Sequence, residues 1–387
     1  MSTNTLAVPQ WRDRKRVLWP LGAVIMLLPL LGVALWQTLG GWGWLWAPMA
    51  ILYGLIPFMD RLFGEDTENP PESVIGELAE DGYYRWALIA AIPLYMVTWV
   101  AMGWFVVNTD LPWYGWLGAT LSAGVGCGLA INVGHELGHQ TSRFEQFLAK
   151  LVLAPGAYGH FFVEHNRGHH VRVATPEDPA SSRFGETFYE FFPRCVVGSF
   201  KSGWNLEKQR LARQGKSVWH WQNHNLQTWA MTAALWTAMV IWLGWAVLPF
   251  LLVAAIYGGS LLEVVNYLEH YGLKRELKED GRYERCQPKH SWNSNHTVTN
   301  LLLYHLQRHS DHHANPTRSY QTLRNFEGVP SLPSGYAAMI LLAYLPPIWF
   351  RLMDPKVVAL HNGDMSLANV KPSIREKVIA KYSAQTA

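Results

Sequence analysis

Cysteine and charged residues are both scarce in this sequence. Its three cysteines, Cys127, Cys195 and Cys286, lie far apart and form no CxxC pair, which excludes a cysteine-ligated zinc site, a fused rubredoxin domain and a disulfide framework. Charged residues make up 16% of the 387 residues, whereas soluble proteins contain roughly 25%. The formal net charge is only +3 and no basic stretch alternates with aromatic residues, so the sequence gives no indication of nucleic-acid binding.

Long apolar runs account for the low content of charge. A helix needs about 20 apolar residues to cross the hydrocarbon core of a membrane, and six stretches of the sequence approach or exceed that length. Five of them contain no charged residue, and the sixth contains only Glu263. Very short connections group the six into three helical hairpins. The predicted spans are residues 17–39, 42–59, 86–107, 111–133, 229–247 and about 248–268.

The positions of lysine and arginine predict the orientation in the membrane. Four of these residues lie between positions 12 and 16, before the first span, whereas the three short connections contain none. We therefore expect both chain ends, and the segment 60–85, to face the cytoplasm. The first apolar run is too long for a signal peptide, so we expect it to remain as an anchor.

One further apolar stretch, residues 336–350, is short and contains two prolines, which favours an interfacial or packed helix over a seventh span. No internal repeat or low-complexity linker divides the sequence. We expect an all-α integral membrane protein that forms one unit over residues 1–387. Its cytoplasmic catalytic segments are predicted at residues 134–228 and 269–387.

Nine of the 16 histidines are concentrated in four short clusters. Residues three or four positions apart share one face of a helix, so clusters of two or three direct their imidazoles to one place. Two clusters directly follow the predicted fourth and sixth spans, which places them at the cytoplasmic membrane surface. The nine are His135 and His139; His165, His169 and His170; His270; and His309, His312 and His313.

Nine imidazoles are too many for one metal ion and suit two ions with four or five nitrogen ligands each. Imidazole binds zinc, copper, iron and nickel alike, so the ligand type does not identify the metal. Residues 135–139 match the HExxH pattern of zinc proteases with Glu136 as the base, but such a site uses one ion and three ligands. A metal transporter would hold its ligands at mid-bilayer. Two irons beside a membrane instead favour activation of dioxygen against an apolar substrate.

At the histidine clusters, the sequence resembles the integral-membrane di-iron family of desaturases and hydroxylases, and within it the membrane alkane hydroxylases (alkane 1-monooxygenases). The segments HELGH at 135–139, EHNRGHH at 164–170 and LQRHSDHH at 306–313 contain boxes of the kind shared with desaturases. The segment NYLEHYG at 266–272 is an alkane-hydroxylase signature. The resemblance extends from the first span to about Tyr320.

This resemblance implies terminal hydroxylation of medium- to long-chain n-alkanes to 1-alkanols in the bacterial inner membrane. It implies two non-haem iron ions, without haem or flavin, and two electrons from rubredoxin, which a reductase in turn reduces. Because the chain has no cysteine pair, we expect rubredoxin to be a separate protein. The alternatives within the same family are a hydroxylase of aromatic methyl groups or fatty acids and, more distantly, a desaturase.

Three further sets of residues are predicted to support the site. Glu263 lies two helical turns from His270, so we expect it to accept a hydrogen bond from a ligand histidine, rather than only a packing contact. Weaker candidates for the same role are Glu136, Glu164, Glu269, Asp178 and Asp311. A basic stretch could attract an acidic electron carrier or anionic lipid: Arg194, Lys201, Lys208, Arg210, Arg213 and Lys216. Candidate limits on substrate length are Trp46, Tyr53, Trp99 and Trp104.

Overall fold

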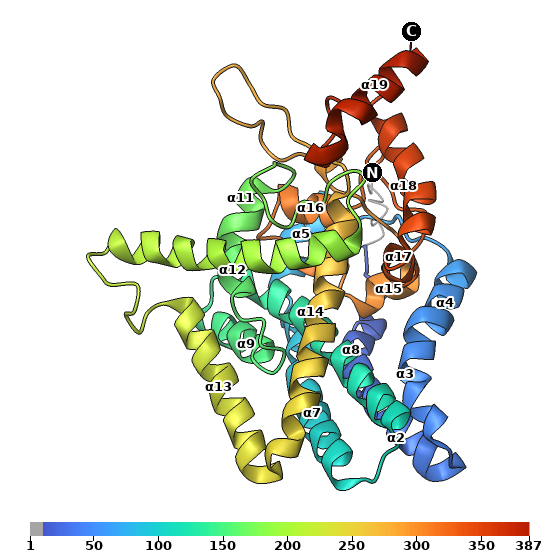
Figure 1. Cartoon of the computed structure of the whole chain (residues 1–387), viewed down its shortest axis with the longest axis vertical. Helices are drawn as coiled ribbons and strands as arrows, with labels where there is room; N and C mark the ends of the chain where they lie inside the picture. Colours follow the sequence, from blue (N-terminus) through green and yellow to red (C-terminus); the bar gives the residue numbers. More distant parts are fainter. Residues whose placement is uncertain (1–10, 387) are drawn as a thin grey trace, which may run out of the picture.

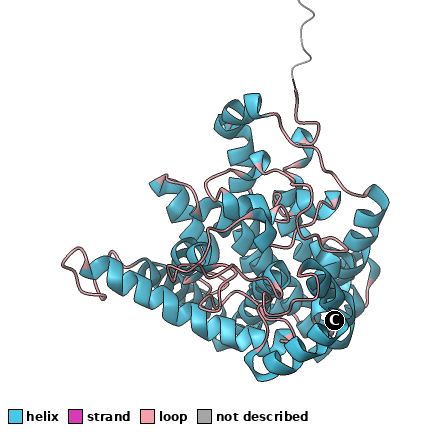
Figure 2. Cartoon of the chain, turned by 90° about the horizontal axis from the view of Figure 1, so that it is seen from above, coloured by secondary structure: helices cyan, strands magenta, loops and turns pink. Residues whose placement is uncertain are grey.

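The computed structural model describes residues 11–386 and the side chains of residues 11–382. Within residues 11–386 all regular secondary structure is helical, and extended segments pair only at four isolated β-bridges. Seen from above, the molecule consists of helices joined by loops (Figure 2). The predicted all-α fold class is confirmed.

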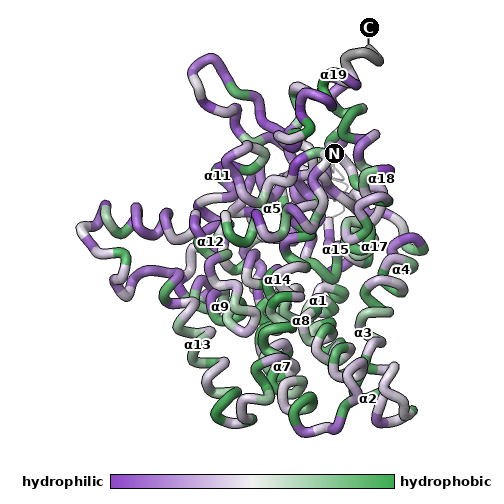
Figure 3. The backbone as a smooth tube through the Cα atoms, in the orientation of Figure 1, coloured by the Kyte–Doolittle hydropathy of each residue, from purple (hydrophilic) through white to green (hydrophobic). Residues whose placement is uncertain are grey.

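Six helical stretches of the described chain are long and apolar enough to cross a membrane, which confirms the number of predicted spans. Their apolar residues gather in the half of the molecule that lies away from the two chain ends (Figure 3). Several are longer than predicted, because the helices continue into polar residues that a hydropathy argument leaves out. The spans are Arg16–Leu39, Trp42–Phe63, Gly82–Asn108, Trp113–Gly138, His224–Leu243 and Trp245–His270.

The connection between the last two spans differs from the prediction. The sequence suggested a turn at Leu248 and Pro249, but α13 (His224–Leu243) ends at Gly244, which has a φ of 77°. Glycine adopts this left-handed conformation without the steric cost that a side chain would bring. Pro249 lies in the first turn of α14 (Leu248–His270), where a missing amide hydrogen costs nothing.

The first two spans are not continuous α-helices. A proline lies at the first or second position of α2, α3 and α4, and proline removes a backbone donor and crowds the preceding turn. The first span consists of α1 (Leu21–Val24), a 3₁₀ turn (Ile25–Leu27) and α2 (Leu28–Leu39). The second consists of a 3₁₀ turn (Trp42–Trp46), α3 (Ala47–Ala50), a π-helical turn (Ile51–Leu55) and α4 (Ile56–Phe63).

The centre of the bundle is the contact between α8 (Trp113–Gly138) and α14. Small residues allow the two backbones to come close. A Cβ atom on Gly258 of α14 would lie 2.4 Å from the Cβ of Cys127 and 3.1 Å from the carbonyl oxygen of Gly124, both on α8. This contact fixes the ends of the two helices beside each other, and those ends carry His135 and His270.

One helix departs from the bundle. α12 (Phe188–Ala212) lies across the spans, whereas α13 runs along the edge of the bundle (Figure 1) and contacts the third span, where Met239 lies beside Gly103. A Thr187–Glu190 capping box begins α12. α7 (Ala91–Asn108), preceded by α6 (Gly82–Ile89), stays in the bundle beside α8.

The remaining helices lie outside the six spans. α17 and α18 include the short apolar stretch 336–350 and are bent by 117° at their junction. α17 buries five of its eight residues, in agreement with a packed helix. These helices are α5 (Glu72–Glu80), α9 (Arg143–Leu153), α10 (Phe161–Glu164), α11 (His170–Arg172), α15 (Thr297–Leu302), α16 (His309–Ala314), α17 (Tyr336–Ala343), α18 (Pro346–Leu360) and α19 (Arg375–Thr386).

Candidate metal centre

The nine clustered histidines come together as two groups, in each of which the candidate ligand atoms all lie within 4.8 Å of one another. The grouping crosses the sequence clusters, since neighbours in the chain separate into different groups. The group of five consists of His135, His139, His165, His170 and His312, and the group of four consists of His169, His270, His309 and His313. Nine of the predicted positions are therefore brought together in space.

A π-helical segment separates two consecutive histidines. Residues His165–His169 form a π-helix between α10 and α11, and π-helices are often found at functional sites because they widen the helical turn. The wider turn aligns residues five positions apart, so the Nε2 atoms of His165 and His170 lie 3.0 Å apart. His169 turns to the other group. Helical spacing predicted that each cluster would direct its imidazoles to one place, and this is wrong for His169, which falls in a different group from His165 and His170.

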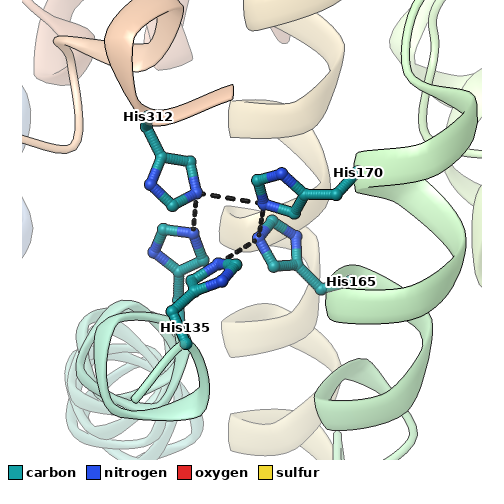
Figure 4. Close-up of side chains that lie close together, drawn as sticks. His135, His165, His170 and His312 are labelled. Atoms are coloured by element: carbon teal, nitrogen blue, oxygen red, sulfur yellow. Dashed lines mark hydrogen bonds between the residues drawn. The ribbon is translucent and has the colours of Figure 1, made fainter. Parts of the chain in front are cut away.

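The ring nitrogens of the group of five converge (Figure 4). The Nε2 atom of His312 lies 2.9 Å from that of His135 and 3.1 Å from that of His170. The Nε2 atoms of His139 and His165 are 3.1 Å apart. A neutral imidazole has one N–H, so several nitrogens that face one point cannot satisfy one another fully. A metal ion at that point would satisfy them.

The group of four has the same character. The Nε2 atom of His313 lies 2.8 Å from that of His309 and 3.3 Å from that of His169. His270 is completely buried, and its Nε2 atom has no hydrogen-bond partner among the described residues. A buried polar atom without a partner is costly, and coordination of a metal ion would remove that cost. Both groups thus fit a metal ion.

The histidines are held in the form that binds metals. Burial lowers the pKa of His139 to about 3. Burial, together with repulsion between neighbouring imidazoles, also lowers the pKa values of His165 and His312 well below their ordinary value. These rings are therefore neutral at physiological pH, and only a neutral imidazole can coordinate a metal ion.

Two of the predicted carboxylates contact candidate ligands. An oxygen of Asp178 lies 2.9 Å from the Nδ1 atom of His169, and both side chains are buried. An oxygen of Glu269 lies 3.1 Å from the Nε2 atom of His309, and the other oxygen accepts a hydrogen bond from Tyr336. Asp178 therefore contacts the outer nitrogen of its histidine, as the partners that orient metal-bound imidazoles usually do, whereas Glu269 contacts the inner nitrogen.

The expectation for Glu263 is wrong. Among the side chains of residues 11–382, its hydrogen-bond partners are Tyr158 and Asn266, together with the thiol of Cys195, and none of the nine histidines. Seven residues of α-helix correspond to about 10 Å along the axis. Glu263 therefore shares a face with His270 but lies too far below it for a hydrogen bond.

The other three carboxylates also bond elsewhere. Glu136 accepts a hydrogen bond from the backbone of Tyr320, a position that also argues against a protease base. Glu164 pairs with Arg172, and Asp311 pairs with Arg324 and Asn315. Their neighbours in the sequence are candidate ligands, but their own side chains stabilise the surrounding loops.

An apolar cavity leads to the two groups. It reaches His135 and His165 of the group of five and His309 of the group of four. Along α8 it extends from His135 to Val125, which is ten residues or about 15 Å. Side chains from the π-helical turn of the second span, from α4, α14, α15 and α17, and from the loop after α15 complete the walls, among them Leu52, Ile56, Leu261, Leu302, Leu306 and Ile340.

The four aromatic residues suggested from the sequence are not among the lining residues of this cavity. Tyr53 is nearest in sequence to it, beside the lining residue Leu52, and its hydroxyl lies 2.7 Å from that of Tyr257. Trp46 donates a hydrogen bond to the backbone of Tyr114, Trp99 is buried, and Trp104 is exposed. The sequence identified apolar spans, but not which faces of the spans are turned inward.

The predicted basic surface is only partly available. Arg194 pairs with Glu186, Arg210 pairs with Glu207, and Lys216 bonds Gln222. The residues of this set that lie exposed on or beside α12 are Lys201, Lys208 and Arg213.

This chain is similar to a known protein family and to several known monooxygenases. A family model described as fatty acid desaturase matches residues 111–341. An alkane 1-monooxygenase of Pseudomonas putida is 46% identical over 379 residues, which cover 97% of this chain and 94% of that protein. An alkane 1-monooxygenase of Alcanivorax borkumensis is 44% identical over an alignment that covers 100% of this chain and 97% of that protein. A xylene/toluene monooxygenase hydroxylase component of Pseudomonas putida is 30% identical over 64% of either chain.

Proposed function

The chain belongs to the fatty acid desaturase family as one of its alkane 1-monooxygenases, and from this we propose that its nine histidines hold two iron ions. It is a multi-pass membrane enzyme that hydroxylates the terminal carbon of alkanes. Iron at the two groups would supply the reduction of dioxygen and the oxidation of the C–H bond. The observation that supports this arrangement is that one apolar cavity touches both groups.

The cavity accounts for the binding of an alkane. Few polar side chains besides the histidines line it, namely Asn132, Asn266, Glu269 and Thr299. Transfer of an alkane from lipid into this cavity contributes little binding free energy, because the lipid tails are as apolar as the cavity walls. Selection must therefore come from shape and depth. A cavity with the histidines at its end presents them with the end of the chain, which favours oxidation of a terminal carbon.

The depth of the cavity is proposed to limit the length of the substrate. Leu261 lines the cavity, and Tyr257 lies one helical turn before it on α14. The hydrogen bond between Tyr257 and Tyr53 therefore lies at the end of the cavity that is remote from the histidines. We propose Tyr53 as the limiting residue of the predicted set, acting with Tyr257, and medium- to long-chain n-alkanes as the substrates.

We further propose that rubredoxin, a small acidic iron protein, supplies the two electrons from the cytoplasmic side of the bacterial inner membrane. Both described ends of the chain lie on the side that carries the histidines (Figure 1). The positive-inside argument assigns that side to the cytoplasm. The exposed basic residues Lys201, Lys208 and Arg213 are proposed to attract the donor.

One experiment tests the proposed function. The protein is analysed for metal as purified, and it is then loaded with iron and incubated with n-alkanes of graded length, dioxygen, rubredoxin and its reductase. We expect two irons per chain and 1-alkanols as products. Product from xylene but not from any alkane would favour the aromatic-methyl alternative, whose relative is less similar. One zinc per chain, without hydroxylated product, would contradict the proposal.

A further inference from the structure

A second, more polar cavity borders the metal centre. We call it the polar chamber, and its polar lining consists of Tyr158, His160, Glu164, Ser199, Glu263 and Asn266. It touches His165 and His169, one histidine from each group. Phe161, His165 and Asn266 line both the polar chamber and the apolar cavity. A single layer of side chains therefore separates the two spaces.

The polar chamber contains two buried atoms that lack a partner. Among the described residues, neither Nε2 of His160 nor Oε2 of Glu164 has a hydrogen bond, and both side chains are at most 5% exposed. The chamber is narrow, with room for on the order of one water molecule. A buried water needs two to four polar partners, and these two atoms with the hydroxyl of Ser199 supply them. Burial also lowers the pKa of His160 to about 4, which keeps its ring neutral.

Polar side chains continue from the polar chamber in two directions. Toward the surface, the other oxygen of Glu164 accepts a hydrogen bond of 2.7 Å from Arg172, whose side chain is 30% exposed. Toward the interior, Glu263 accepts hydrogen bonds from Tyr158 and Asn266. A carboxylate within a membrane-spanning helix is expensive and usually has a function. Glu263 thus lies at the inner end of a polar line that begins at the cytoplasmic surface.

The reaction needs a path by which protons reach the metal centre. Monooxygenation inserts one oxygen atom into a C–H bond and releases the other as water, and it consumes two electrons from the donor and two protons. The apolar cavity offers no route for protons from lipid. We propose that the polar chamber holds an ordered water, positioned by His160, through which protons pass from the cytoplasmic surface to Glu263 and on past Asn266 to the metal centre. This inference rests on the proposed function.

The water itself can be tested without turnover. X-ray hydroxyl-radical footprinting of the holoenzyme in ¹⁸O-water labels side chains that lie beside bound water. We expect Tyr158 to be labelled in the wild type, although it is buried. In His160→Phe its labelling should fall to that of Tyr95, another buried tyrosine, which bonds Cys127 and does not line the chamber. A wild-type Tyr158 labelled no more than Tyr95 would overturn the inference, whatever the enzyme does with alkanes.

The proton role is tested by turnover with fixed iron content. In His160→Phe and Glu263→Gln, we expect alkanol formation to slow on the order of tenfold, because a positioned proton donor contributes at least that much. The solvent isotope effect should rise, since proton transfer becomes limiting. His361→Phe, a replacement of a histidine outside the chamber, is the matched control.

The outcomes remain distinguishable. Unchanged rates and isotope effects in both chamber variants, at normal iron content, would overturn the proton role. If His160→Phe does not retain iron, His160→Gln and Ser199→Val replace it, and the glutamine should preserve more activity because it keeps a hydrogen-bonding group. Absence of alkanol from iron-loaded wild type would instead contradict the proposed function and leave the footprinting result to stand by itself.

Discussion

Replacing Asp178 with asparagine should weaken metal binding in the group of four histidines while leaving the group of five nearly unchanged. One carboxylate oxygen of Asp178 accepts hydrogen bonds from His169 Nδ1 at 2.9 Å and from Ser181 at 2.7 Å, and the other faces the backbone N–H of Ala180 at 3.2 Å. Every neighbour is a donor. An asparagine amide must turn its own N–H₂ toward at least one of them.

The magnitude follows from this conflict. A buried donor left without an acceptor costs about 1–3 kcal/mol. If His169 loses its acceptor, its ring is no longer fixed with Nε2 toward the metal. Loss of a carboxylate that orients a metal-bound histidine typically costs about 10–100-fold in metal affinity. The group of five should change less, because Asp178 makes no hydrogen bond with any of its histidines among the described contacts.

Chelator competition measures this prediction. Iron-loaded wild type and Asp178→Asn are titrated with a chelator of known affinity, and the iron retained per chain is followed. The wild type should release both ions in one affinity range, whereas the variant should release one ion at about 10–100-fold lower chelator concentration. Asp364→Asn, at an exposed carboxylate, is the control. Release of both ions together, as in the wild type, would refute the assigned contact.

Four further predictions concern other parts of the molecule. Tyr53→Ala should shift product formation toward longer alkanes, measured by competition among chain lengths, and an unchanged profile would contradict a limit at the Tyr53–Tyr257 contact. Gly258→Ala should lower thermal stability by about 1–3 kcal/mol because its Cβ meets α8, whereas Gly76→Ala, in open space on α5, should be neutral or stabilising. Burial lowers the pKa of His160 from 6.5 to about 4. As the pH falls, His160 is therefore protonated in the unfolded chain before it is protonated in the folded protein. The free energy of unfolding decreases below pH 6.5, by up to about 3 kcal/mol near pH 4. His160→Gln should show a smaller loss of melting temperature between pH 7 and pH 5. Charge reversal at Lys208 and Arg213 should raise the KM for rubredoxin at low salt and have little effect at high salt; a KM that is insensitive to both would exclude these residues from docking.

Local patterns predicted the spans and the histidines well, since both depend on neighbours in the sequence. Apolar length identified six spans, and helical spacing identified nine histidines that the fold does bring together. The pairing of those histidines depends on tertiary structure. His169 and His170 separate because a π-helical turn inserts an extra residue, and no simple apolar period in the sequence indicates that turn.

Contacts between distant segments were the least predictable. Glu263 is buried, and one of its hydrogen-bond partners is Tyr158, which lies 105 positions away in the sequence. The apolar cavity draws its walls from α4, α8, α14, α15 and α17. Periodicity shows that an apolar helix has no polar face, and therefore cannot show which apolar face lines a cavity. The aromatic residues proposed from the sequence, such as Trp104, could not be sorted into lining and lipid-facing positions for this reason.

The two cavities separate the alkane from water: the apolar cavity holds the alkane, and the polar chamber holds the water and protons that the reaction uses. An alkane reaches the histidines through the apolar cavity, whose lining residues, such as Leu261 and Leu302, form no hydrogen bonds with water. Water and protons are confined to the polar chamber beside His160 and Glu263. Every residue that lines this chamber has a polar side-chain group, except Phe161 and Ala180. Phe161 and Asn266 lie between them, one apolar and one polar. If this layer were opened, water would enter the apolar cavity and weaken alkane binding, at about 0.8 kcal/mol for each CH₂ left exposed. Phe161 should therefore tolerate aromatic replacement better than truncation to alanine, and the loss on truncation should appear in the KM for alkane before it appears in iron content.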